Sequence, residues 1–173
     1  MLFPPPPWTH APIRLYHGTV LSDAEEIVAA GVDIRRGRTR TDFGAGFYTT
    51  TLARQAKSWA YQRAQGTRAG QAAVVAFDVD RERFGTLATL PFVRGDFDAE
   101  DFWSLVVHCR TGGGRHGFPG RADGMYDAVA GPVAFLCQQR LTIQGVDQIS
   151  FHTRAAQDVL NSGRRTITWT SNR

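Results

Sequence analysis

Apolar positions near the start of the chain change from a two-residue period to a helical one. Residues 13–17 alternate around a leucine and run into Gly18, which predicts a short strand that ends in a turn. A helix is expected next over Asp23–Ala30. Ser22 and the glutamate three residues after it have the spacing of a capping box, and Gly31 follows as a stop signal. This segment is therefore predicted to be a strand followed by a helix.

The same order returns in the next segment. Phe47–Thr50 is predicted to be a strand. A helix capped by Thr51 is expected from there to about Gln65, because apolar residues recur at helical spacing. Residues 72–79 form a nearly continuous apolar run, which is typical of a strand buried on both faces in the middle of the core. Residues 98–110 are predicted to be a helix with acidic residues at its start.

The last third of the chain carries further short strands. Tyr126–Ala130 and Asp147–His152 have strand-like patterns, and Thr166–Trp169 is expected to be a final strand. Thr153 is placed to cap a helix that extends to about Leu160. The strands and helices do not follow a regular strand–helix–strand order, which favours an α+β fold over a doubly wound sheet.

The composition is that of an ordinary globular domain. The chain has 173 residues, with 42% hydrophobic and 21% charged residues. No apolar run is long enough to cross a membrane, and the N-terminus is proline-rich and lacks the layout of a secretory signal. We therefore expect a Pro-rich leader over residues 1–12, a single domain over 13–173, a cytoplasmic location and no membrane partner.

Charge and cysteines narrow the function only slightly. A formal net charge of +4 permits an anionic partner such as a nucleotide or a nucleic acid. Part of the excess lies in residues 35–40, a basic run that is more often a solvated loop than a phosphate site, and both interpretations stay open. Cys109 and Cys137 lack the spacing of metal ligands, so no metal is expected.

The segment from Thr41 to Trp59 holds the most distinctive candidate site. Gly44 and Gly46 allow the backbone to approach a ligand closely, and Tyr48 follows them at the start of an extended segment. Trp59 lies at helical spacing on the apolar face of the next predicted helix. Tyr48 and Trp59 are therefore expected to face a common pocket.

Three motifs in this order resemble the ADP-ribosyltransferase superfamily, in the branch with a His-Tyr-Glu type triad that includes diphtheria toxin and the poly(ADP-ribose) polymerases. They are Tyr16-His17-Gly18-Thr19, Phe43-Gly44-Ala45-Gly46-Phe47-Tyr48 and the polar residue Gln148 that opens a late strand. The residues around Tyr48, Tyr126 and Gln148 also look like a bacterial family of compact transferase-like proteins. The resemblance spans residues 13–160. It implies an ADP-ribosyltransferase fold, with split, antiparallel-rich β-sheets and flanking helices around an NAD cleft.

The resemblance also implies roles for the matched residues, with NAD as the co-substrate. His17 would hydrogen-bond a ribose hydroxyl of the adenosine half, Gly18 would bind the nicotinamide carboxamide through its backbone, and Tyr48 would stack on the nicotinamide ring. Trp59 stands where the polymerase-like members carry a second stacking tyrosine. Together with Gln148, the implied catalytic residues are His17 and Tyr48. The implied cofactor-binding residues are His17, Gly18, Thr19, Phe43, Gly44, Gly46, Tyr48 and Trp59.

Gln148 departs from the family pattern, which places a glutamate at this position. A glutamine carbonyl still accepts a hydrogen bond from the ribose 2′-OH, but it carries no charge and does not act as a base. Mono-ADP-ribosylation is therefore expected rather than chain elongation, and a Gln148→Glu variant is expected to raise turnover. Strand alternation places the neighbouring Asp147 on the opposite face.

These features predict an NAD-dependent mono-ADP-ribosyltransferase that modifies a protein or a nucleic acid. A role as a toxin, delivered into another cell or held by a cognate antitoxin, or as a regulatory modifier would fit. A catalytically silent NAD or ADP-ribose binding module is the alternative from a different class, on account of Gln148. An RNA-directed transferase or a relative of the tRNA 2′-phosphotransferases is a third, supported by the basic run. A small-molecule modifier like the rifamycin transferases fits only the chain length.

Ordinary structural roles are expected for several other polar residues. His152 is interpreted as structural. His116 is placed in a loop, where a solvated role is favoured and contact with a substrate is the alternative. Asp42 and Asp127 are expected to bond to backbone groups in turns.

Overall fold

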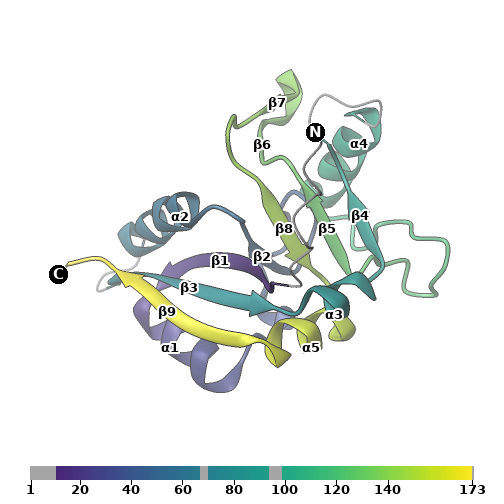
Figure 1. Ribbon diagram of the computed structural model, residues 1–173. Coiled ribbons are helices and arrows are strands. Elements are labelled where there is room, and N and C mark those ends of the chain that lie inside the picture. Colours follow the sequence, from purple (N-terminus) through teal and green to yellow (C-terminus); the bar gives the residue numbers. More distant parts are fainter. Residues whose placement is uncertain (1–10, 67–69, 94–98, 173) are drawn as a thin grey trace, which may run out of the picture.

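The computed structural model describes residues 11–66, 70–93 and 99–172 and shows an α+β protein (Figure 1). The predicted Pro-rich leader falls mainly on residues 1–10, which lie outside the described residues. Within the described ranges the chain forms five α-helices, two 3₁₀ helices and nine strands, and the strands make three separate sheets. The predicted α+β class is confirmed.

The first sheet consists of three antiparallel strands, β1 (Ile13–Val20), β3 (Ala72–Val79) and β9 (Arg164–Thr170), with β3 in the middle. The prediction that residues 72–79 form a strand buried on both faces is confirmed. Val74 packs towards α2 (Ala53–Gln65) on one face, whereas Phe77 belongs to the core on the other face.

The second sheet has the strand order β2 (Phe47–Thr49), β8 (Gln148–Phe151), β5 (Ala128–Gly131) and β4 (Thr89–Pro91). Its neighbouring strands are antiparallel except β4 and β5, which are parallel. Tyr16 in β1 and Thr50, just after β2, exchange two backbone hydrogen bonds of 2.8 and 2.9 Å. These bonds join the edges of the two sheets, which meet at a steep angle (Figure 1).

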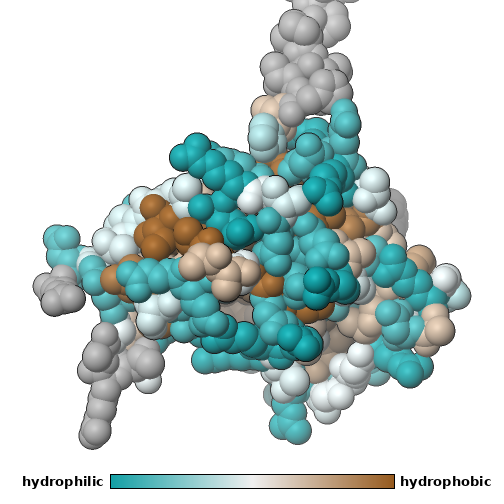
Figure 2. All heavy atoms as spheres, turned by 90° about the horizontal axis from the view of Figure 1, so that it is seen from below, coloured by the Kyte–Doolittle hydropathy of each residue, from teal (hydrophilic) through white to brown (hydrophobic). Residues whose placement is uncertain are grey.

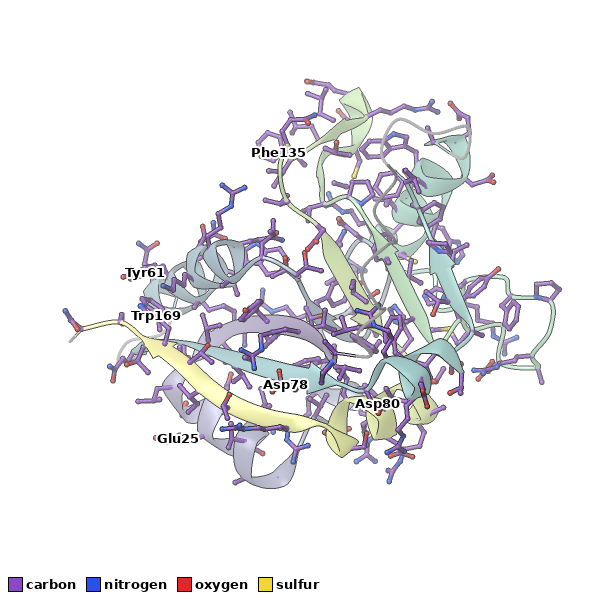
Figure 3. The ribbon with its side chains drawn as sticks, in the orientation of Figure 1. Glu25, Tyr61, Asp78, Asp80, Phe135 and Trp169 are labelled. Carbon is purple, nitrogen blue, oxygen red and sulfur yellow. The ribbon has the colours of Figure 1, made fainter. Side chains whose placement is uncertain are left out.

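A small hairpin lies between β5 and β8. It comprises β6 (Ala134–Leu136), the 3₁₀ helix η2 (Cys137–Gln139) and β7 (Leu141–Thr142). Phe135 in β6 is 60% exposed and projects from this hairpin, well away from the first sheet (Figure 3). Ala134 points the other way, into the core beside β5.

Helices cover both faces of the first sheet (Figure 1). α2 packs against β1 and β3 on one face, and α1 (Leu21–Ala30) packs against β3 and β9 on the other. α5 (Arg154–Ser162) lies on the same side as α1 and contacts α3 (Arg81–Gly85). α4 (Ala99–Arg110) packs against β5 of the second sheet, and the 3₁₀ helix η1 (Ile34–Arg36) follows α1.

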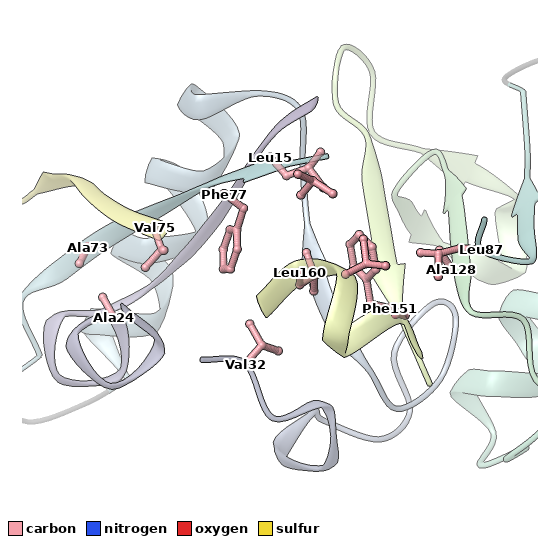
Figure 4. Packing of buried hydrophobic residues seen from close by; sticks show 13 residues of the cluster. Leu15, Ala24, Val32, Ala73, Val75, Phe77, Leu87, Ala128, Phe151 and Leu160 are labelled. Carbon is pink, nitrogen blue, oxygen red and sulfur yellow. The ribbon is translucent and has the colours of Figure 1, made fainter. Parts of the chain in front are cut away.

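The largest core cluster lies between the first sheet, α1 and α5 (Figure 4). Leu15, Phe77 and Leu160 are fully buried there. Phe151 joins them from the second sheet, so one core is shared by both sheets. Burial of each of these large side chains stabilises the fold by about 1.5 to 3 kcal/mol.

Two of the predicted helix caps are absent. α1 starts at Leu21, before the predicted capping box, and Val20 at its N-cap position provides no side-chain hydrogen bond. α2 starts at Ala53 rather than at Thr51. The Thr51 N–H is instead bound by the carboxylate of Asp147 at 2.9 Å, a contact from another part of the chain that local pattern does not reveal.

Most of the predicted strands are confirmed with small shifts at their ends. β1 continues through the predicted turn to Val20, and β9 begins at Arg164. The predicted cap of α5 is confirmed, since the Thr153 hydroxyl accepts a hydrogen bond of 3.3 Å from the N–H of Ala156. The sequence does not predict α3, β4 or the β6–β7 hairpin, because such short elements carry too little periodic pattern.

The described helices are all too short or too polar to cross a membrane. Figure 2 shows the face of the molecule that carries α1, α5 and β9. This face is largely hydrophilic, and its hydrophobic residues form small separate clusters.

Candidate functional site

Two adjoining cavities lie where the first sheet meets the glycine-containing loop before β2. The smaller has a volume of about 310 Å³ and extends towards α1 and η1, whereas the larger, of about 510 Å³, extends towards α2. Together they form a cleft within the size range of small-molecule sites. Both cavities are lined by His17, Asp23, Arg38, Tyr48 and Arg63.

His17 in β1 is held in one tautomer. Its Nδ1 lies 2.7 Å from the backbone carbonyl oxygen of Tyr48, and a carbonyl oxygen only accepts, so Nδ1 carries the proton. Burial lowers the pKa of His17 to about 4, which keeps the ring neutral near pH 7. The ring stacks on Phe47 with 4.3 Å between centroids. Nε2 of His17 is therefore a hydrogen-bond acceptor.

Gly18 contributes its backbone to the larger cavity. A Cβ at this position would lie 1.9 Å from the backbone oxygen of Ala56, so only glycine allows β1 and α2 to approach so closely. In an antiparallel strand, successive residues direct N–H and C=O to alternate edges. The N–H and C=O of Tyr16 point to Thr50 in the isolated bridge between the two sheets. The N–H and C=O of Gly18, two residues on, point to the same edge of β1, just beyond this bridge.

Tyr48 and Trp59 line the same cavity, as predicted. The Tyr48 hydroxyl donates to the carbonyl oxygen of Gly44 at 2.8 Å and accepts from the N–H of Phe43 at 2.9 Å. It also lies 2.7 Å from the hydroxyl of Thr41. Burial raises the pKa of this phenol, which stays protonated. These bonds fix the Tyr48 ring against the glycine loop, residues 41–46.

Two histidines hold carbonyl groups of the glycine loop. Nε2 of His116 lies 2.9 Å from the oxygen of Phe43, and Nδ1 of His152 lies 2.8 Å from that of Ala45. Burial lowers the pKa of both rings, that of His152 to about 3. His152 is thus structural, as predicted. The prediction for His116 is wrong, because this ring is partly buried and also accepts a hydrogen bond from the N–H of Tyr126.

Gln148 lies on the same sheet face as Tyr48, because Tyr48 pairs with Ser150, two residues further along β8. It is 4% exposed and lines neither cavity of the cleft. Its amide nitrogen donates to Oδ2 of Asp42 at 2.7 Å and to the carbonyl oxygen of Pro132 at 2.9 Å. This environment argues against the expectation that Gln148→Glu raises turnover, since a carboxylate has no N–H for these two acceptors.

Asp42 does more than bond to backbone in a turn. Its carboxylate accepts from the N–H of Ala134 at 2.8 Å, but it also accepts from Nε of Arg110 at 2.8 Å and from Gln148. The residue is 6% exposed. The sequence contains no local signal for this contact, because Asp42 and Arg110 are separated by 68 positions.

Asp147 lies apart from Gln148, as strand alternation predicts. Its carboxylate accepts from the hydroxyl of Thr50 at 2.5 Å and from the N–H of Thr51 at 2.9 Å. Nε2 of Gln55 donates to its backbone oxygen at 2.6 Å. Asp147 therefore ties the start of α2 to β8.

The other residues implied for cofactor binding fall into two groups. Thr19 and Gly46 line the smaller cavity. Phe43 is fully buried in the core, 6.2 Å from Phe92 between ring centroids, so its side chain is not placed to contact a ligand. Gly44 has a φ of +80°, which favours glycine, and it lies beside Cys109 rather than in the cleft.

The arginines of the cleft differ in their partners. Arg36 and Arg63 form salt bridges with carboxylates of α1. Arg38 lines both cavities and, among the described residues, forms no salt bridge. Arg35 does not line the cleft and pairs with an aspartate two residues before it. In the basic run, Arg36 and Arg38 thus line the cleft, whereas Arg35 lies outside it.

The cleft combines aromatic rings with acidic and basic side chains. It offers a neutral imidazole, a strand edge and the rings of Tyr48 and Trp59. Its charged lining residues are Asp23, Glu26, Asp33, Arg36, Arg38 and Arg63. No group of three or more His, Cys, Asp or Glu residues placed to hold a metal occurs within the ranges that the structure describes. Sequence reasoning missed Asp23 and Arg63, because they come from two separate helices and only the fold brings them together.

Comparisons with known proteins place the chain in a family. A search of the curated proteins finds no match. A family model described as "Protein of unknown function (DUF3990)" matches residues 13–135, which is more than half of the chain and includes His17, Gly18, Tyr48 and Trp59. Gln148 lies beyond the matched range. The chain therefore belongs to the DUF3990 family of proteins of unknown function.

Proposed function

We propose that the protein is an NAD-dependent mono-ADP-ribosyltransferase. In this reaction the bond between nicotinamide and ribose breaks, an acceptor oxygen or nitrogen bonds to the ribose carbon, and nicotinamide and a proton are released. The observation that carries the proposal is that His17, Gly18, Tyr48 and Trp59 line one cavity. The resemblance to ADP-ribosyltransferases implies that Gly18, Tyr48 and Trp59 grip the nicotinamide of NAD, whereas His17 binds a ribose hydroxyl of the adenosine half.

Each of these groups has chemistry that suits the task. In the neutral His17 ring, Nδ1 donates its hydrogen bond to the Tyr48 carbonyl. Nε2 is therefore left to accept a hydrogen bond from a ribose hydroxyl. The Gly18 edge matches a carboxamide, which both donates and accepts. The rings of Tyr48 and Trp59 supply faces for a positively charged aromatic ring, at about 1 kcal/mol per ring beyond burial.

Breaking this bond requires little acid catalysis, because nicotinamide already carries a positive charge and leaves as a neutral molecule. The transition state has positive charge on the ribose, and binding that favours this state over the ground state gives the rate increase. In this proposal Arg38 faces the anionic pyrophosphate of NAD from the shared wall of the two cavities.

A silent NAD-binding module is the second candidate function. The observation that favours it is the amide at position 148, which supplies no base for the acceptor. The acceptor of a transferase would need to be a good nucleophile by itself or to be activated by another group. For the transferase, we propose a protein or a nucleic acid as the acceptor, the cytoplasm as the site of action and a toxin–antitoxin pairing.

The test is incubation of the purified protein with NAD. Nicotinamide release and transfer of labelled ADP-ribose into bacterial lysate are followed, with protease or nuclease treatment to identify the acceptor class. Tyr48→Ala and Trp59→Ala are expected to reduce release, each weakening NAD binding about fivefold if one stacking contact is lost.

Tyr61→Ala is the matched control on the same helix. Tyr61 is 50% exposed and packs edge-on against Trp169, with 5.2 Å between centroids, on the outer side of α2 (Figure 3). Release that depends on Tyr48 and Trp59 but not on Tyr61 supports the transferase. NAD binding without turnover in any lysate favours the silent module, and no NAD binding refutes both.

A further inference from the structure

The hydrogen bonds of Gln148 determine which way its amide faces. Both partners of its nitrogen, the Asp42 carboxylate and the Pro132 carbonyl, are acceptors. Only the NH₂ end of the amide satisfies them, and its two hydrogens match two acceptors. The nitrogen of Gln148 therefore faces Asp42, and the oxygen Oε1 does not.

Asp42 is itself fixed by bonds from three separate elements. Arg110 in α4 donates from Nε at 2.8 Å, Ala134 in β6 donates its N–H at 2.8 Å, and Gln148 in β8 donates at 2.7 Å. The Arg110 guanidinium neutralises the buried charge and also contacts Sγ of Cys137 at 3.1 Å. The carboxylate has no freedom to turn without breaking several of these bonds at once.

We infer that Asp42 is a positioning residue, which orients the side-chain amide of Gln148. Its carboxylate favours glutamine over glutamate at position 148. A glutamate at this position would set a second carboxylate against Oδ2 of Asp42 and the carbonyl of Pro132. Like charges at hydrogen-bond distance in a buried site do not both ionise. The glutamine is then a requirement of the surrounding structure. The inference about positioning needs only these contacts, and its effect on turnover rests on the proposed function.

Within the described residues, the ionisable groups that interact with Asp42 are a guanidinium, a phenol and a thiol. Arg110, Tyr48 and Cys109 interact electrostatically with it, and Cys137 contacts Arg110. Burial raises the pKa of the Cys109 thiol to about 11. A carboxylate introduced at position 148 would therefore be repelled directly by the Asp42 carboxylate.

The first test is thermal unfolding of Gln148→Glu and Gln148→Met between pH 5 and pH 8. The introduced carboxyl is expected to have a raised pKa in the folded state. The stability of the Gln148→Glu variant is therefore kept at low pH, where the carboxyl is protonated, and falls as pH rises. The melting temperature of Gln148→Glu relative to the parent should fall by roughly 5 °C more at pH 8 than at pH 5. Gln148→Met has no ionisable group, and its difference from the parent should not change with pH. An equal loss for Gln148→Glu at both pH values would overturn the inference.

The second test moves the carboxylate. In Asp42→Asn/Gln148→Glu the side-chain amide stands at position 42, where it can donate to the carboxylate at position 148. The pH-dependent loss of Gln148→Glu is expected to disappear in this double variant. If it persists, Asp42 is not the group that selects glutamine.

Turnover gives a separate readout. If the protein releases nicotinamide and Gln148 has the role that the resemblance implies, Asp42→Asn is expected to lower kcat about tenfold with little change in KM. An amide at position 42 both donates and accepts, so it no longer fixes the orientation of the Gln148 amide. A higher KM with an unchanged kcat would contradict a positioning role. Absence of turnover in every variant, the parent included, would refute the proposed function and leave the unfolding tests to decide on Asp42.

Discussion

Nδ1 of His17 lies 2.7 Å from the backbone carbonyl oxygen of Tyr48, and this contact links β1 of the first sheet to β2 of the second. One end of the imidazole is used to join the sheets, which leaves Nε2 as an acceptor in a ring that burial keeps neutral. The same residue therefore serves both the junction of the sheets and the cleft beside it. Tyr48 has a similar double role, with its hydroxyl held by the glycine loop and its ring in the cavity wall.

The stability of the protein is expected to fall on acidification. Burial lowers the pKa of His17 to about 4 and that of His152 to about 3, below the value of about 6.5 in an unfolded chain. The contribution of the two neutral histidines to the free energy of unfolding is complete above pH 6.5. It is lost as pH falls towards their pKa values in the folded state, because the unfolded state then binds more protons. Urea unfolding between pH 7 and pH 4 should show a loss of roughly 3 kcal/mol per histidine. His152→Gln should reduce the slope, and an unchanged slope would contradict the assignment.

Gly18→Ala is expected to destabilise the fold strongly. The new methyl group would lie 1.9 Å from the backbone oxygen of Ala56, and neither β1 nor α2 can move without disturbing the core. Overpacking of this kind costs at least about 1 to 3 kcal/mol. Gly85→Ala is the matched control, since a Cβ there meets nothing within 4 Å. Equal melting temperatures for the two variants would show that the close contact of β1 and α2 is not needed.

Arg38→Ala is expected to weaken NAD binding about tenfold, as for loss of one charge-assisted contact. Arg38 lines both cavities, whereas Arg35 in the same basic run lies outside the cleft and pairs with an aspartate. Arg35→Ala removes the same charge and should leave binding almost unchanged. Titration with NAD at low and high salt measures both variants. Equal weakening would mean that the run acts only through its net charge.

Asp127→Ala is expected to cost about 3 kcal/mol, the loss typical of breaking a buried ion pair. Asp127 is 1% exposed, bonds to backbone as predicted through the N–H of Ala88 at 2.9 Å, and accepts both hydrogens of a bidentate contact from Arg121. The carboxylate also receives the Thr153 hydroxyl at the start of α5. Denaturant unfolding measures the loss. Asp158→Ala, at a solvent-exposed salt bridge, is the control and should change stability by less than about 1 kcal/mol.

Much of the fold could be predicted from local pattern. The apolar run of residues 72–79 determined the central strand, the spacing after Thr153 determined the cap of α5, and the placement of Tyr48 and Trp59 on a strand and the next helix led them to one cavity. These features depend on neighbours within a few positions, where periodicity and capping act. The proposed roles of His17, Tyr48 and Gln148 come from a resemblance and stay predictions.

Only the tertiary structure decided how the candidate site is supported. Asp147 replaced the predicted cap at Thr51, His116 bound the glycine loop rather than solvent, and Phe43 turned into the core. Asp42 met Gln148 across 106 positions, which made the amide at position 148 the matching partner of a buried carboxylate. The sequence by itself determined which residue types were present and which local elements they formed. The fold decided the partners of the polar groups, because buried donors and acceptors must be paired and their partners come from distant parts of the chain.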